Sequence, residues 1–211
     1  MTEQNPILSG LNAKQREAVE VLDGPLLILA GAGSGKTKCL THRIANLIHH
    51  GTRPSQILAV TFTNKAANEM KKRVEKLLGG GSAPMMGTFH SICVRILRED
   101  GEQLSCGLTR NFVIFDTDDS EKLIKMIMKE LGFDPKEIKH KAIKSHISAA
   151  KNQLMTPEAY QLDAEDNRFT RAVKQIFPAY QRKLIEHNAL DFDDLLQKTV
   201  QLFEQCPEIL A

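Results

Sequence analysis

The sequence predicts an α/β protein: a parallel sheet with helices on both faces, and a mostly helical inserted subdomain. Three observations predict it. Strand and helix signals alternate over the first 90 residues, a glycine-rich turn joins the first expected strand to the next helix, and signals from residue 118 to about 187 are almost all helical. A βαβαβ order favours parallel strands, because each crossover helix returns the chain to the same end of the sheet.

The first part of the chain is expected to hold three strands with helices before and between them. A helix is expected over residues 11–22, and residues 26–30 are apolar on both faces, as a central parallel strand should be. Residues 57–62 predict a second buried strand and residues 85–89 a third. The intervening helices are expected to stop at Gly51 and at the three glycines of residues 79–81.

The second part changes character near residue 105. Residues 112–115 predict one more strand before the helical segment, and a last helix is expected over residues 191–203. We therefore expect a first domain at residues 1–108, a helical inserted subdomain at 109–188, and an incomplete return to the first domain at 189–211.

Composition indicates an ordinary cytoplasmic protein. The chain has 211 residues, of which 42% are hydrophobic and 26% charged, with a net charge of +2. The four cysteines have no metal-ligand spacing, which favours a reducing compartment. The N-terminus lacks the pattern of a signal peptide, and no apolar run is long enough to span a bilayer, so no membrane partner is expected.

A phosphate-binding pattern occupies residues 30–37, Ala-Gly-Ala-Gly-Ser-Gly-Lys-Thr, with Ala in place of the usual first Gly. Glycines let the backbone N–H groups turn toward phosphate oxygens, and the following helix adds its positive end. An accidental glycine-rich turn is the alternative, but a true P-loop must follow a strand and open a helix, as this one is expected to do. The pattern therefore predicts a P-loop NTPase.

The P-loop predicts ATP and Mg²⁺ as cofactors. Lys36 would reach the β- and γ-phosphates, and the Thr37 hydroxyl would ligate Mg²⁺, which makes these two the catalytic candidates. The remaining phosphate-binding candidates are the loop residues whose backbone N–H groups face inward: Ala32, Gly33, Ser34 and Gly35.

Four further segments resemble motifs of the UvrD/Rep family of superfamily 1 helicases. Residues 11–15 (Leu-Asn-Ala-Lys-Gln) resemble its Q motif, residues 61–70 its motif Ia, residues 87–91 (Gly-Thr-Phe-His-Ser) its motif Ib, and residues 191–196 its motif Id. Each segment alone is weak evidence. Together with the P-loop they match the family in order and spacing over essentially the whole chain.

The resemblance implies the RecA-like type of P-loop NTPase fold, and an ATP-driven motor that moves 3′ to 5′ on single-stranded DNA and separates duplex. By that resemblance Gln15 reads adenine, while Phe62, Thr63, Asn64 and His90 lie along the DNA strand. The residue types suit these roles, since an amide both donates and accepts and an aromatic ring can stack on any base. Other interpretations stay open: Phe62 as a buried strand residue, Thr63 or Asn64 as helix caps, and His90 as a partly buried, hydrogen-bonded histidine.

Residues 136–151 form a basic segment with five lysines and a single acid. If it is helical, His140, Lys144 and Lys151 share one side. In the family the inserted domain lies against duplex DNA at the fork, so Lys144 and Lys151 are candidates for phosphate contacts at single-strand/duplex junctions. A solvated helix face is the alternative.

The sequence departs from the family in one respect, because no segment matches the acidic Walker B motif. The second RecA-like domain with its arginine finger is also not found, so we expect a fragment whose C-terminal half is its missing partner. Asp116 follows four apolar residues and resembles Walker B, but a strand running into a capped helix is preferred. Three acids at residues 191–194 are likewise interpreted as a helix cap.

The hypothesis is therefore the N-terminal ATP-binding part of a DNA helicase, which alone binds nucleotide weakly and does not unwind. One alternative is a stand-alone small-molecule kinase with Asp116 as its metal-site acid. Another is a non-catalytic P-loop module that binds DNA or a protein, although intact Lys36 and Thr37 count against it. The sequence sets no oligomeric state.

Overall fold

The computed structural model describes residues 6–81, 83–163 and 167–210. The chain divides into two compact units, Met1–Ile92 and Cys93–Ala211, and each is described by itself. Mixed α/β structure is confirmed, but helices dominate and the sheets are small. No helix of the described residues is long and apolar enough to cross a membrane.

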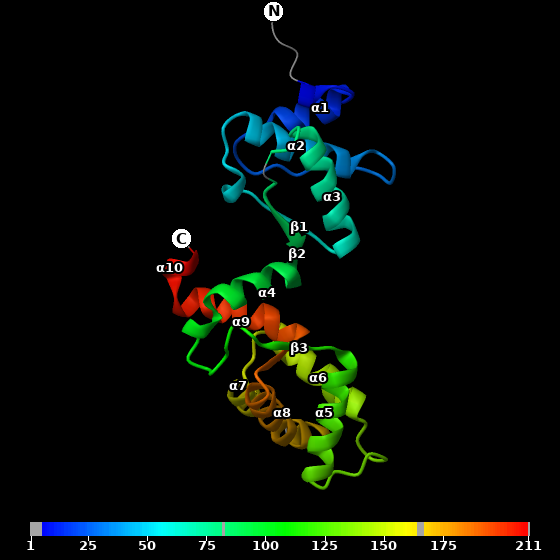
Figure 1. The fold of residues 1–211 in the computed structure, drawn as a ribbon. Helices are drawn as coiled ribbons and strands as arrows, with labels where there is room; N and C mark the ends of the chain where they lie inside the picture. Colours follow the sequence, from blue (N-terminus) through cyan, green and yellow to red (C-terminus); the bar gives the residue numbers. More distant parts are fainter. Residues whose placement is uncertain (1–5, 82, 164–166, 211) are drawn as a thin grey trace, which may run out of the picture. The chain divides into compact units, whose positions relative to one another are not determined.

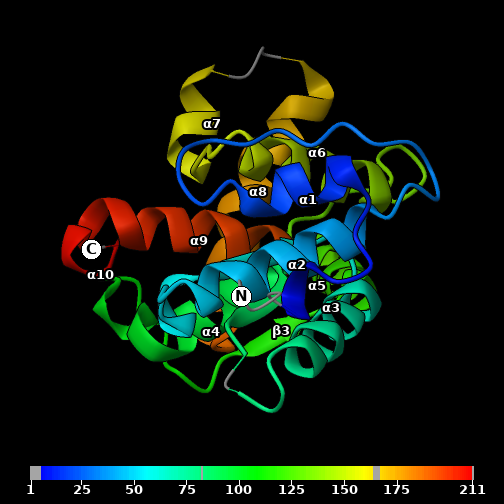
Figure 2. The same ribbon diagram turned by 90° about the horizontal axis from the view of Figure 1, so that it is seen from above.

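The first unit pairs two parallel strands with helices that cover them (Figure 1). Its elements in order are η1 (Pro6–Leu8), α1 (Ala13–Glu20), α2 (Lys36–His49), η2 (Pro54–Gln56), β1 (Leu58–Thr61), α3 (Asn64–Leu77), β2 (Met85–Thr88) and the start of α4 (Phe89–Asp100). A small core joins Ile44 of α2, Ala59 of β1, and Met70 and Val74 of α3. Helices α1 and α2 lie side by side (Figure 2). This packing fixes the loop between α1 and α2.

The expected central strand at residues 26–30 is wrong. The segment has no strand pairing, and the side chains of Leu27 and Leu29 are 81% and 86% exposed. A parallel strand obtains its burial and its ladder hydrogen bonds from neighbouring strands. Within the described residues the sheet of this unit contains β1 and β2 only. An apolar run without a pairing strand therefore remains extended and exposed.

The second unit contains most of the helices. Its elements after α4 are η3 (Gly101–Gln103), β3 (Val113–Phe115), α5 (Thr117–Glu130), α6 (His140–Asn152), α7 (Pro157–Asp163), α8 (Arg168–Glu186), β4 (Ala189–Asp191), α9 (Phe192–Gln205) and α10 (Pro207–Leu210). The larger core lies among α5, α6, α7 and α8, and its members include Ile127, Ile143 and Phe177. A second core joins α4, β3, β4 and α9.

Strands β3 and β4 form a parallel pair that closes the helical segment between them. Val113 pairs with Ala189 and Phe115 with Asp191. Just before this pair, Asn188 donates from its side chain to the Thr109 hydroxyl (2.7 Å) and accepts from the Thr109 N–H (3.0 Å). The strand at residues 112–115 is thus confirmed as Val113–Phe115. The short strand β4 is not among the strands predicted from the sequence, and all three of its residues, Ala189–Asp191, are buried.

A buried charge cluster lies where β4, α6, α8 and α9 meet. The Lys151 ammonium donates to Asp191 and to Asp194 at 2.8 Å each, and its side chain is fully buried. The Tyr180 hydroxyl donates to Asp191 (2.9 Å), and the Gln181 amide donates to Asp194 (3.1 Å). Such a cluster holds together only while every charge has its partner, because an unpaired buried charge is very costly.

The cluster also shifts the pKa of its members. Burial of Lys151 opposes its charge, but the two carboxylates outweigh burial and raise the pKa of the ammonium. Burial likewise opposes ionisation of Asp191, and the Lys151 ammonium outweighs it, so the pKa of Asp191 is lowered. The pKa of Asp194 is raised, because its burial and the neighbouring Asp191 charge exceed the effect of Lys151. Lys151 is therefore charged at neutral pH and lies between two buried carboxyl groups.

Replacing Lys151 with Met should destabilise the second unit by about 3–5 kcal/mol, because two buried carboxylates lose their counter-ion. Urea unfolding of the chain at neutral pH measures this loss. Adding Asp191→Asn and Asp194→Asn to Lys151→Met should recover part of the lost stability. An amide oxygen can still accept the capping hydrogen bonds at the start of α9, but it carries no charge. Lys139→Met, at an exposed lysine, is the control and should change stability by less than about 0.5 kcal/mol.

The loss of unfolding free energy caused by Lys151→Met should become smaller as the pH falls. In the wild type, the lowered pKa of Asp191 gives stability that is present above the ordinary Asp value and lost as pH falls through the folded-state value. In the variant, buried carboxylates without a cation have raised pKa values, so stability rises as pH falls. A deficit that stays constant from about pH 7 to about pH 4 would contradict this account of the cluster.

Candidate functional site

The P-loop of residues 30–37 forms an exposed turn that ends in helix α2. Gly33 and Gly35 have left-handed backbone conformations, with φ of 76° and 87°. Gly35 is the N-cap of α2, and Lys36 is the first residue of the helix. Residues with a Cβ atom rarely adopt these φ values, so glycine is required at both positions. The result is a loop whose backbone N–H groups and helix end can receive an anion.

The Lys36 ammonium lies inside the loop. It donates to the carbonyl of Ala30 (2.9 Å) and to the carbonyl of Gly31 (3.1 Å). The Ser34 hydroxyl donates to the same Gly31 carbonyl (2.7 Å). A lysine ammonium has three donors, so these two bonds account for two of them. The charge is therefore held at the loop by neutral carbonyls, which phosphate oxygens can replace with a stronger, charge-assisted bond.

Gln15 lies against the same loop. Its side-chain amide donates to the Ser34 carbonyl (2.9 Å), and a Cβ on Gly35 would come within 2.7 Å of that amide nitrogen. Asn12 fixes Gln15 through a capping box at the start of α1, with the Gln15 N–H donating to the Asn12 side chain at 2.9 Å. The capping-box spacing of Asn12 and Gln15 is the sequence signal for Asn12, which is not among the predicted site residues.

A cavity of about 320 Å³ opens beside this arrangement. Its walls include Gln15, Ser34, Gly35 and Lys36, together with Ile28 and Cys39. The cavity thus brings four of the predicted nucleotide-binding residues together, and its volume is in the range of small-molecule sites. Ala32 and Gly33 are exposed on the turn, and Thr37 is exposed in the first turn of α2, outside the cavity walls. A lysine, a hydroxyl and free N–H groups are the donors that a Mg²⁺-nucleotide requires.

A second group of predicted residues gathers where β1 and β2 end. Thr61 pairs with Thr88 in the last register position of the two parallel strands, so both strands end at the same edge. Phe62 follows directly and is 95% exposed. The Thr88 hydroxyl lies 3.5 Å from the Asn64 side-chain oxygen, linking the two segments. The structure therefore places Phe62, Thr63 and Asn64 beside the junction of β2 with α4, whose second residue is His90.

The alternatives for these residues can now be decided in part. The interpretation of Phe62 as a buried strand residue is wrong, because its ring is almost fully exposed. Thr63 is the N-cap of α3, with its hydroxyl accepting from the Ala66 N–H at 3.2 Å, so the cap interpretation is confirmed for Thr63. His90 is half-buried in the first turn of α4. A cap can still offer its backbone to a ligand, so DNA contact at these residues stays a prediction.

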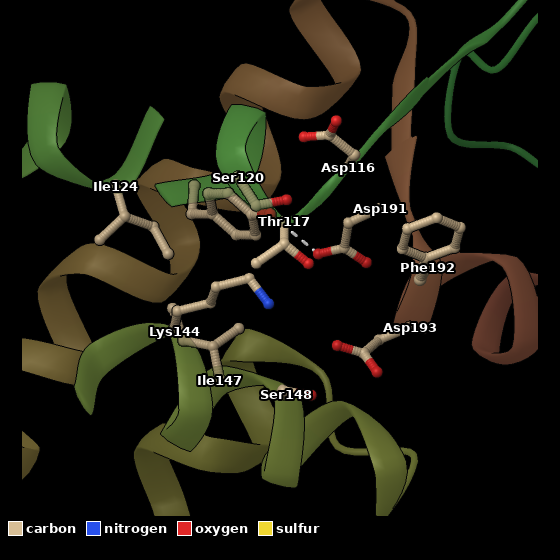
Figure 3. Close-up of a pocket in the computed structure, with 11 residues that line it drawn as sticks. Asp116, Thr117, Ser120, Ile124, Lys144, Ile147, Ser148, Asp191, Phe192 and Asp193 are labelled. Atoms are coloured by element: carbon tan, nitrogen blue, oxygen red, sulfur yellow. Dashed lines mark hydrogen bonds between the residues drawn. The ribbon is translucent and has the colours of Figure 1, made fainter. Parts of the chain in front are cut away.

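The predicted DNA contact of Lys151 is wrong. Its ammonium is fully buried between Asp191 and Asp194 and cannot reach a phosphate. Lys144, two turns earlier on the same side of α6, is half-buried and points into a small cavity of about 20 Å³, toward Thr117 and Asp191 (Figure 3). The two lysines share helix α6, but the packing of α6 on α9 turns this side of the helix inward. A DNA contact of Lys144 stays a prediction.

Asp116 and Asp191, the acids considered as candidates for a Walker B motif, are helix caps, which is the interpretation that the sequence favours. Asp116 is the N-cap of α5 and accepts from the Asp119 N–H at 2.9 Å; this bond lowers the pKa of the Asp116 carboxyl. Asp191 caps α9 in the same way, accepting from the Asp194 N–H at 2.8 Å. A carboxylate at a helix N-terminus satisfies free N–H groups and complements the helix dipole.

Comparison with known proteins gives a consistent result. The model of the UvrD/REP helicase N-terminal domain matches residues 11–211. The chain is 50% identical over 208 residues to the ATP-dependent DNA helicase PcrA of Bacillus subtilis, a match that covers 98% of this chain and 28% of that protein. The PcrA proteins of Staphylococcus aureus and Staphylococcus epidermidis are 47% and 48% identical over the same lengths. The chain thus spans little more than a quarter of these relatives.

Proposed function

Because the chain belongs to the UvrD/REP helicase family, we propose that it supplies the ATP-binding loop and part of the DNA-binding surface of an ATP-dependent 3′-to-5′ DNA helicase. The observation that carries the proposal is that one small α/β unit presents both groups of residues: the P-loop with Gln15, and the edge where β1 and β2 end. The curated relatives are named ATP-dependent DNA helicases, which agrees with it.

In this proposal each residue of the P-loop has a separate task. Lys36 exchanges the carbonyls of Ala30 and Gly31 for β- and γ-phosphate oxygens, and the N–H groups of residues 32–35 receive the remaining charge. Thr37 holds Mg²⁺, which neutralises phosphate charge when it is bound. Gln15, held by Asn12, presents its amide to the adenine edge. Turnover also requires an acid that activates water, and no segment of the sequence matches the Walker B motif that would supply it.

The edge of the sheet supplies the DNA contacts in this proposal. Phe62 offers an exposed ring on which a base can stack, and Thr63, Asn64 and His90 offer polar groups to the backbone. The strand would thus be held without sequence preference. We further propose that the partners of this chain are single-strand/duplex junctions of DNA and the remainder of a longer protein. The proposed compartment is the cytoplasm.

The inserted subdomain is proposed at residues 109–188. Two contacts support these boundaries: the side-chain pair of Thr109 with Asn188, and the pairing of Val113, just inside the segment, with Ala189, the first residue after it. Both ends of the segment therefore meet at one place, as the ends of an insertion must. No observation favours the kinase alternative, because the Asp116 carboxylate that it needs for metal already caps α5.

Lys36→Ala should weaken binding of Mg²⁺-ATP by at least about tenfold, because a charge-assisted bond to phosphate contributes about 1.5–3 kcal/mol. Fluorescence titration of the chain with a labelled ATP measures it. Lys76→Ala, at an exposed lysine of α3, removes the same charge elsewhere and should bind normally. Equal affinity of the wild type and Lys36→Ala would remove the nucleotide site from the P-loop.

Phe62→Ala should weaken binding of single-stranded oligo-dT by about five- to a hundredfold, because stacking of a base on an aromatic ring contributes about 1–3 kcal/mol. The free energy of unfolding should change by less than about 0.5 kcal/mol, since the ring is exposed. Leu58→Ala, an exposed apolar residue at the other end of β1, is the matched control. Unchanged oligo-dT affinity in Phe62→Ala would separate this edge from DNA.

A further inference from the structure

A cationic groove lies in the second unit between the end of α5 and the start of α6. Its volume is about 820 Å³. Gly132, Phe133 and Pro135 form an uncharged wall, and four exposed lysines stand around it: Lys125, Lys129, Lys139 and Lys141. Neither the P-loop nor the edge of the first sheet uses this groove. We propose that it is a docking site for an acidic protein segment that carries an apolar anchor residue.

The shape of the groove is fixed by its own backbone. Gly132 ends α5 in a left-handed conformation (φ 74°), and the N–H of Phe133 returns to the Met128 carbonyl at 2.9 Å. The Asp134 side chain accepts from the Lys136 N–H at 2.8 Å. Phe133 packs its inner face on the main core of the unit. The groove is therefore formed before a partner arrives, which lowers the ordering cost of binding.

The groove carries an excess of positive charge, with four lysines against one acid, Asp134. Three acids close to it in sequence already have other partners: Glu130 is paired with Lys183 (3.3 Å), Glu137 with Arg168, and Glu121 is hydrogen-bonded to the His140 ring (3.3 Å). None of the four lysines has an ion partner within the described residues, and Asp134 is the one acid of the groove wall. A set of cations around an opening attracts an acidic partner and orients it.

The uncharged wall favours a peptide over nucleic acid. A phosphodiester backbone requires polar groups facing each phosphate. Here the centre offers Phe133, Pro135 and the bare backbone of Gly132. The methylene groups of a lysine side chain can contact an apolar side chain of the ligand, while its ammonium attracts an acidic one. A volume of this size accepts one or two large side chains. The fitting ligand thus combines Asp or Glu with Leu or Phe.

The test uses the whole chain and a fluorescein-labelled synthetic peptide of about twelve residues, in which Asp and Glu alternate with Leu and Phe. Anisotropy at low salt gives the affinity. The double variant Lys129→Glu/Lys139→Glu should weaken binding by about tenfold or more, because two attractions become repulsions. A peptide with Ser in place of Leu and Phe should also bind about tenfold more weakly, since it has no anchor.

The control variant is Lys71→Glu/Lys72→Glu on α3, which makes the same charge change at two exposed lysines and should bind the peptide normally. Circular dichroism confirms that both double variants are folded. No binding by the wild type, equal binding of the Ser peptide, or equal loss in the control variant would overturn the proposal. Displacement of the peptide by oligo-dT or a hairpin duplex, with the same lysines needed for DNA, would overturn it in favour of a nucleic-acid surface.

Discussion

The second unit depends on one buried ammonium placed between two buried carboxylates. Lys151 comes from α6, while Asp191 and Asp194 come from the end of β4 and the first turn of α9. The same two carboxylates cap α9 and accept bonds from Tyr180 and Gln181 of α8. One small cluster therefore sets the helix start, the short strand and the contact between three helices. Neutral packing could stabilise these elements equally well, but it would not fix their register as strictly.

In the first unit, the positions of the predicted DNA-binding residues depend on two parallel strands that end at the same edge of the sheet. Residues that follow such strands meet at one edge of the sheet, which is why binding groups in α/β folds collect there. Phe62 and the segment leading to His90 are brought together in this way. The P-loop depends instead on two left-handed glycines and on the start of α2. The exposed leucines of residues 26–30 show that a strand sequence alone does not make a strand.

Local signals in the sequence predicted local features well. The P-loop glycines, the caps at Thr63, Asp116 and Asp191, and the strands at 57–62 and 85–89 each have a chemical cause within a few residues. Features that depend on distant partners were missed or wrong. Nothing near Lys151 in the sequence indicates that Asp191, 40 positions later, neutralises it, so the sequence predicts a surface lysine where the structure has a buried one. Likewise, residues 189–191 are too few to show the alternating pattern of a strand. They form strand β4 only because they pair with β3.

Hydrolysis of Mg²⁺-ATP, measured for this chain with and without single-stranded DNA, tests the central claim most directly. We propose that this chain supplies the nucleotide loop and a DNA-binding edge, and no segment of its sequence matches the motif whose acid activates water. The expected result is nucleotide binding that Lys36→Ala weakens by at least about tenfold, with no appreciable turnover under either condition. Turnover that ignores DNA and disappears in Asp116→Asn would contradict the account, because the cap of α5 would then be the metal-site acid of a complete small enzyme.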